Sequence, residues 1–225
     1  MESQAVDSRA GVGEGGRGTG VGVSRRAAGR SLVLLAGFVL VAVSAELGWW
    51  EGVDESVNDW AAAHRVDALW NAAKTVFDVA TPETALPITL AIGVLVAWRR
   101  RRVWIAVDAA VRVGLVVASV LVLKPVLAIP GPTRNSLGGH GGSFPSGHTT
   151  STLVCVALLL AWAGWPRSAT GRAAVNAVVL AVVGGTVIYL QYHYLSDVVG
   201  GVVLGLLIAT VPLPAPGRRS RYGSG

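Results

Sequence analysis

Apolar runs that alternate with short arginine-rich segments dominate the chain. A helix of about 20 apolar residues crosses the ~30 Å hydrocarbon layer of a bilayer, and six runs are candidates for such helices. They cover residues 31–50, 84–98, 103–123, 149–164, 173–190 and 196–212. Prolines then end the last run, at Pro212, Pro214 and Pro216. The pattern predicts an all-α fold, an integral membrane six-helix bundle.

The segment between the first two runs, residues 51–83, mixes polar and apolar positions. Its large apolar side chains recur near helical spacing, at Trp60, Leu69, Trp70, Val76 and Phe77. This pattern is typical of an amphipathic helix that lies on a membrane surface. We therefore expect residues 51–83 to lie at the interface.

The first run also resembles a cleaved signal peptide. Arg25, Arg26 and Arg30 would form its basic region, and small residues follow the apolar stretch. The run continues to Trp49 and Trp50, which suit the membrane interface, so a retained anchor is favoured. The pattern leaves open whether residues 31–45 are removed.

Composition supports a membrane protein. Of the 225 residues, 52% are hydrophobic and 14% are charged, which is too apolar for a soluble domain of this length. We expect a disordered cytoplasmic tail over 1–30, the membrane domain over 31–212, and a basic cytoplasmic tail over 213–225. Cys155 is the single cysteine, so it forms no internal disulfide and no cysteine-based metal site.

The net charge of +6 does not indicate nucleic-acid binding, because the arginines form short clusters between apolar runs. With six alternating helices, 14 of the 19 basic residues fall on one side. The positive-inside rule places that side, with both termini, in the cytoplasm. The expected location is the plasma membrane, as a multi-pass protein, with the loops at 145–148 and 192–197 outside the cytoplasm.

Asp108 and Arg112 lie inside the third run, four residues apart. On a helix they share one face and can form an ion pair. Charges at membrane depth are often functional, but Asp108 lies near the basic end of its run. A structural pair is therefore the favoured interpretation.

Three polar clusters share the outer face: residues 124–134, 145–148 and 192–197. Ser146 and Gly147 lie at a predicted helix start, where a hydroxyl, free backbone N–H groups and the helix dipole favour an anion. Lys124 adds a positive charge suited to phosphate oxygens. These residues predict a phosphate-binding site.

His193 and Asp197 are four residues apart, so the carboxylate can accept one ring N–H and leave the other nitrogen as a nucleophile. His148 would donate a proton to the leaving oxygen. Each residue also has a simpler interpretation: Ser146 as a helix cap, the histidines as interfacial rings, and Lys124 as a snorkelling side chain. Their occurrence together on one face favours phosphoryl transfer.

The chain resembles the type-2 phosphatidic-acid phosphatase superfamily, which includes the vanadium haloperoxidases. Pro145–His148 reads "PSGH", and "TVIYLQYHYLSD" retains His193 and Asp197 of the last motif. The resemblance covers roughly residues 30–212. It implies that His193 forms a phosphohistidine, Asp197 orients it, and His148 acts as acid and then base. Lys124, Ser146 and Gly147 would bind phosphate, with no metal and no cofactor.

Two positions depart from the family signature. Gly131 and Val187 stand where the signature has arginines, and each lost charged donor should cost about 1.5–3 kcal/mol of phosphate binding. Arg134 lies three residues beyond the first position, within reach of the same site, and is therefore a candidate phosphate-binding residue.

The sequence thus predicts a membrane phosphatase that acts on a lipid phosphate or polyprenyl diphosphate outside the cytoplasm. The missing arginines leave two alternatives open: a weakened or inactive relative that binds lipid phosphate, and a lipid phosphotransferase. Haloperoxidase action fits least, because those relatives are soluble and use arginines to bind vanadate. The expected partners are the lipid substrate and the bilayer, with no nucleic acid. The lipid, the pathway and the oligomeric state are left open.

Overall fold

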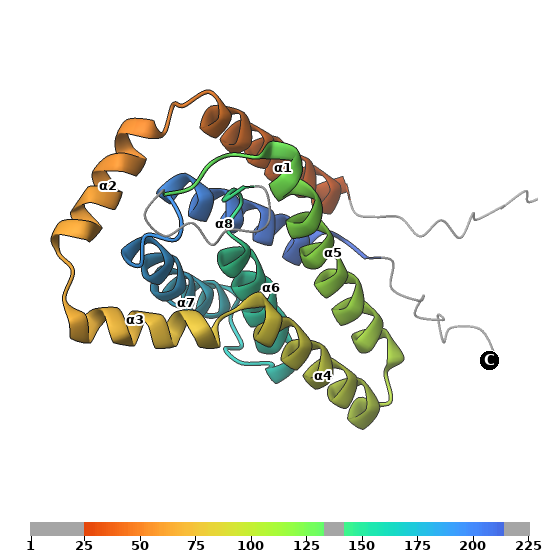
Figure 1. Cartoon of the computed structure of the whole chain (residues 1–225). Helices are drawn as coiled ribbons and strands as arrows, with labels where there is room; N and C mark the ends of the chain where they lie inside the picture. The colour runs from red at the N-terminus through yellow and green to blue at the C-terminus, as the bar shows by residue number, and fades with distance from the viewer. Residues whose placement is uncertain (1–24, 133–141, 214–225) are drawn as a thin grey trace, which may run out of the picture.

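The computed structural model describes residues 25–132 and 142–213, and within these ranges it contains helices and no strands. Their bounds are α1 Arg25–Glu46, α2 Glu51–Ala63, α3 Asp67–Val79, α4 Pro82–Arg100, α5 Val103–Leu127, α6 Gly147–Ala163, α7 Ala169–Tyr189 and α8 Leu195–Thr210 (Figure 1). The predicted all-α class is confirmed. Arg134 and most of both predicted tails lie outside the described residues.

Three described helices, α1, α5 and α7, are each long and apolar enough to cross a bilayer. The helices α3 and α4 meet this test as a pair bent by 46°, whereas α6 and α8 are apolar but shorter, with 17 and 16 residues. The protein is a membrane protein, and in the described part of the chain three helices, or four spans if the bent pair is one of them, meet this test.

The first helix begins earlier than the apolar pattern predicted. It starts at Arg25 rather than at residue 31, so the end of the predicted disordered tail is helical. Arg25, Arg26 and Arg30 lie in its first two turns. Helix formation therefore extends beyond the apolar run into its basic flank.

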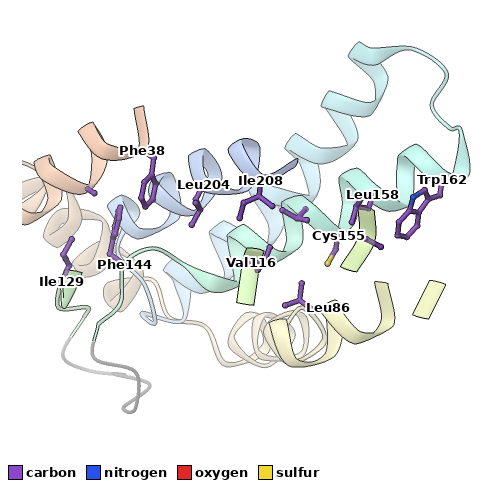
Figure 2. Close-up of a cluster of buried hydrophobic side chains, with 13 residues drawn as sticks. Phe38, Leu86, Val116, Ile129, Phe144, Cys155, Leu158, Trp162, Leu204 and Ile208 are labelled. Carbon is purple, nitrogen blue, oxygen red and sulfur yellow. The ribbon is translucent and has the colours of Figure 1, made fainter. Parts of the chain in front are cut away.

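The helix α6 lies at the centre of the bundle and packs against α4, α5, α7 and α8 (Figure 1). A cluster of buried apolar side chains follows it from Phe144, just before its start, to Trp162 near its end (Figure 2). Phe38 of α1, Leu86 of α4 and Leu204 of α8 reach this cluster from three sides. This core fixes the start of α6 relative to its neighbours.

A glycine allows α6 and α8 to approach closely. A Cβ at Gly201 would lie 2.8 Å from the Ser146 carbonyl oxygen and 3.0 Å from Thr149 Cβ. The Thr150 hydroxyl donates to the Gly201 carbonyl at 3.2 Å. The absence of a side chain at 201 therefore allows the second turn of α8 to contact the first turn of α6 directly.

Residues 51–83, predicted to lie at the membrane interface, form two helices and the start of a third. Polar contacts attach them to the end of α7 and the loop that follows it. The Tyr189 hydroxyl accepts the Val66 N–H at 2.9 Å, between α2 and α3. The Gln191 amide donates to the Asn58 carbonyl at 3.2 Å. The helices α2 and α3 thus pack beside the loop that contains His193.

The ion pair between Asp108 and Arg112 is present, at 3.0 Å, as predicted. Arg112 also donates to the carbonyls of Ile208 and Val211 at the end of α8, the latter at 3.3 Å. A cation next to the last carbonyls of a helix is favoured by the helix dipole. The pair therefore joins α5 to α8, away from the histidines.

Asp54 of α2 joins this helix to the start of α8. Its carboxylate accepts the Ser196 backbone N–H at 3.0 Å and the Ser196 hydroxyl at 2.6 Å. Both residues are buried. Burial also raises the pKa of the Asp54 carboxyl above its ordinary value.

Replacing Asp54 by alanine should lower the free energy of unfolding by about 1–3 kcal/mol, because two buried donors of Ser196 lose their acceptor. Asp54→Asn is the matched control, since its amide oxygen can still accept the Ser196 N–H. Burial places the pKa of Asp54 in the folded protein above its value in the unfolded chain, so the folded state favours the protonated carboxyl. The free energy of unfolding of wild type should therefore fall, relative to that of Asp54→Asn, as pH rises through the folded-state pKa. Thermal unfolding in detergent measures this, and equal stability of wild type and Asp54→Ala would contradict it.

Candidate active site

The loop between α7 and α8 positions His193. The backbone N–H groups of Tyr192 and His193 both donate to the Val187 carbonyl, at 3.0 and 3.3 Å. The loop therefore folds back on the last turn of α7, and the His193 side chain is buried.

Asp197 lies in the first turn of α8, fully buried. Its Oδ2 accepts the Tyr194 backbone N–H at 2.9 Å and lies 3.1 Å from His193 Nδ1. The predicted four-residue spacing thus places the carboxylate beside Nδ1, so Nε2 is the ring nitrogen of His193 that this carboxylate does not engage. Asp197 therefore caps its own helix and orients the imidazole.

His148 is the second residue of α6 and faces the same site. Its ring centroid lies 6.4 Å from that of His193, and the two ring planes meet at 63°. The ring also stacks on Phe77 of α3, with centroids 4.2 Å apart. Its buried Nε2 has no hydrogen-bond partner in the part of the chain that the structure describes, so this nitrogen is available to a ligand.

Ser146 caps α6, which is the simpler of its two predicted roles. Its hydroxyl oxygen accepts the Thr149 N–H at 3.4 Å and the Thr149 hydroxyl at 3.1 Å. Its own N–H donates to the Asp197 carbonyl at 3.0 Å. The N–H groups of Gly147 and His148 begin the helix and have no acceptor within it. The hydrogen bond from the Ser146 N–H to the Asp197 carbonyl thus connects the start of α6 directly to the His193–Asp197 pair.

Lys124 lies in the last turn of α5, within electrostatic range of the His148 ring and the Asp197 carboxylate. The structure thus brings Lys124, Ser146, Gly147, His148, His193 and Asp197 to one end of the bundle. Arg134, the sixth residue of loop 129–141, belongs to the part that is not described.

Apolar or small residues fill both positions where the family signature has arginine. Val187 is fully buried in a cluster with Ala73, Phe77, Leu190 and Val198. It therefore supports Phe77, on which His148 stacks. A Cβ at Gly131 would lie 2.7 Å from Ser143 Oγ, so Ser143 occupies the space beside it.

Sequence reasoning gave no role to Ser143 or Phe77. Ser143 is a serine in a glycine-rich loop, and Phe77 belongs to an amphipathic pattern, so neither has a local signal of function. Within the described ranges, no group of three or more His, Cys, Asp or Glu side chains is arranged to hold a metal ion.

Comparison with known proteins gives a consistent result. The family model described as the PAP2 superfamily matches residues 71–221. The fold is similar to the crystal structure of a transmembrane PAP2-type phosphatidylglycerolphosphate phosphatase from Bacillus subtilis, with a TM-score of 0.64 and 23% identity. That match covers 80% of this chain and 92% of the bacterial protein. No curated protein matches the sequence.

Proposed function

The chain belongs to the PAP2 superfamily, and from this premise we propose that it is a membrane phosphatase acting on a lipid phosphate or polyprenyl diphosphate. One observation supports this most strongly. Two buried imidazoles lie 6.4 Å apart at one end of the bundle, and a carboxylate lies 3.1 Å from Nδ1 of one of them. This arrangement supports a role for one ring as nucleophile and for the other as proton donor toward one phosphate group.

In the first step, His193 Nε2 attacks phosphorus and forms a phosphohistidine. The electron pair of the breaking P–O bond passes to the leaving oxygen, which takes a proton from His148. In the second step, His148 removes a proton from water, which attacks phosphorus and releases inorganic phosphate and His193. Asp197 holds the Nδ1 proton throughout and stabilises the charge that develops on the ring.

The phosphate oxygens would contact Lys124, the Ser146 hydroxyl and the first N–H groups of α6. In this proposal these groups stabilise the negative charge that develops on the phosphate oxygens, which is the main source of catalysis in phosphoryl transfer. Lys124 is a point charge rather than a bidentate donor, and Val187 and Gly131 supply no donor side chain. We therefore expect Arg134, from outside the described residues, to add a contact to bound phosphate.

The proposed topology has six crossing helices, α1 and α4 to α8, with both termini in the cytoplasm of a plasma-membrane protein. The distribution of arginines supports it. Arg100 at the end of α4 donates to the Trp162 carbonyl at the end of α6, at 2.6 Å, so the basic end of α4 lies beside the end of α6. The histidines are at the opposite ends of α6 and α7, which is the extracytoplasmic side in this topology.

The test is a phosphate-release screen of the purified protein in detergent over phosphatidate, phosphatidylglycerophosphate and polyprenyl diphosphates. We expect release from at least one lipid and inhibition by orthovanadate, which mimics the transferred phosphoryl group. Product analysis with added alcohol acceptors distinguishes hydrolysis from phosphotransfer. If every lipid is bound but none is hydrolysed, the chain is the non-catalytic relative and the proposal fails.

A further inference from the structure

Ser143, just before α6, contacts both members of the His193–Asp197 pair. Its hydroxyl donates to Asp197 Oδ2, and its Oγ lies 2.9 Å from His193 Nδ1. The sequence motifs assign no role to this serine. Its position between the imidazole and the carboxylate nevertheless makes it part of the same hydrogen-bond network.

The donors and acceptors of this network fix the direction of each bond. Asp197 Oδ2 accepts from the Tyr194 N–H, at 2.9 Å, and from the Ser143 hydroxyl. Because the hydroxyl proton is directed to Asp197, a lone pair of Ser143 Oγ is left for the His193 Nδ1–H. That proton therefore has two acceptors, Oγ at 2.9 Å and Oδ2 at 3.1 Å. Moving it to Nε2 would break both contacts.

The backbone around Ser143 is held against the end of α5. Its N–H donates to the Ile129 carbonyl at 2.8 Å. A Cβ at the preceding Gly142 would lie 2.8 Å from the Lys124 carbonyl oxygen, and the following Phe144 is fully buried. Packed residues on both sides of Ser143 therefore hold its backbone in place. Its hydroxyl contacts the His193–Asp197 pair from a fixed position and not from a mobile loop.

Gly131 is the residue that makes room for this serine. A Cβ at 131 would lie 2.7 Å from both Cβ and Oγ of Ser143, closer than van der Waals contact permits. A side chain at 131 would therefore force residue 131 or Ser143 to shift, and we expect the shift to disturb the contacts of Ser143 with the His193–Asp197 pair. The position of Ser143 beside the pair thus depends on the absence of a side chain at 131.

We propose that Ser143 is a positioning residue that fixes the tautomer and orientation of His193, and that Gly131 is required to admit it. The catalytic consequence rests on the proposed function, whereas the placement of the Nδ1 proton does not. Ser143 acts through His193 and Asp197 and has no assigned contact with the substrate.

In the kinetic test, Ser143→Ala should lower kcat by about 10–100-fold, as loss of an orienting hydrogen bond typically does, and leave KM within about twofold of wild type. Ser143→Cys, which keeps the volume but donates weakly, should behave similarly. In an Asp197→Asn background the same change should cost less than about threefold, because both residues act on one proton. Losses that multiply in the double variant, or an unchanged kcat, would overturn the proposal.

The role of Gly131 has its own control. Gly131→Ala should lower kcat in the Ser143 protein but have little effect in a Ser143→Gly background, where the atoms that it would contact are absent. Gly114→Ala in α5 is the matched control, because its Cβ would meet nothing within 4 Å. Equal effects of Gly131→Ala in both backgrounds would contradict the pairing.

A spectroscopic test does not depend on turnover. In [15N]histidine-labelled protein in detergent, His193→Gln identifies the His193 signals. Ser143→Ala should shift the Nδ1–H signal of His193 and speed its exchange with water, while His64 stays unchanged. An unchanged His193 signal would refute the proposal even in an active enzyme. A response to Ser143→Ala in a protein that hydrolyses no lipid would refute the proposed function alone.

Discussion

Replacing His193 by glutamine should reduce phosphate release from the preferred lipid by at least about 10³-fold, since removal of a nucleophile eliminates the covalent route. Glutamine retains much of the volume of the buried ring and can still bond Asp197, so the fold should persist. The structural reason for the large effect is the free Nε2, which the contact of Nδ1 with Asp197 at 3.1 Å leaves to the substrate.

The matched control is His64→Gln, an exposed histidine at the end of α2 whose Nδ1 bonds the Trp60 carbonyl. It should keep wild-type activity. Release rates are measured on detergent-purified variants with equal thermal midpoints. Retention of more than about a tenth of wild-type activity in His193→Gln would exclude this residue as the nucleophile.

Replacing His148 by alanine should reduce steady-state phosphate release from lipid substrates by about 10²–10⁴-fold, the range typical of a lost general acid. The effect should depend on the leaving group. An alkoxide needs a proton, but p-nitrophenolate leaves without one. The variant should therefore still release about one p-nitrophenol per protein molecule from p-nitrophenyl phosphate, and then slow because no base activates water.

Rapid mixing with absorbance detection would record this burst. The alanine removes the ring that stacks on Phe77 at 4.2 Å, so His148→Phe serves as a second variant that preserves stacking but not proton transfer. Both variants should show the burst. If His148 had only a structural role, His148→Phe would retain full turnover, and this result would contradict the assignment.

The apolar pattern predicted most helices well, because their ends have local chemical causes. The run at 149–164 is α6, Gly147–Ala163, which begins after the Ser146 cap. The run at 173–190 begins earlier, at Ala169, because Ser168 accepts the Gly171 N–H at 3.0 Å and adds a turn. Caps and apolar runs act within a few residues, so a sequence reveals them.

The arrangement of α2 and α3 was not predictable in the same way. Contacts with residues more than 120 positions later, such as Val66 with Tyr189 and Asp54 with Ser196, determine their places. The same holds for Ser143. Its proposed role depends on where the fold places Gly131 and His193. The hydrophobic periodicity of the sequence does not predict those positions. The motif residues were identifiable because their chemistry and order are specific.

The most direct test of the catalytic account is to identify the phosphorylated residue during turnover. The wild-type protein is mixed with a ³²P-labelled lipid substrate, quenched at high pH where phosphohistidine survives, digested and analysed by mass spectrometry. The account predicts label on His193 in wild type, none in His193→Gln, and persistent label in His148→Ala with the p-nitrophenyl substrate. Label on His148 or another residue, or rapid turnover without a phosphoenzyme, would contradict it.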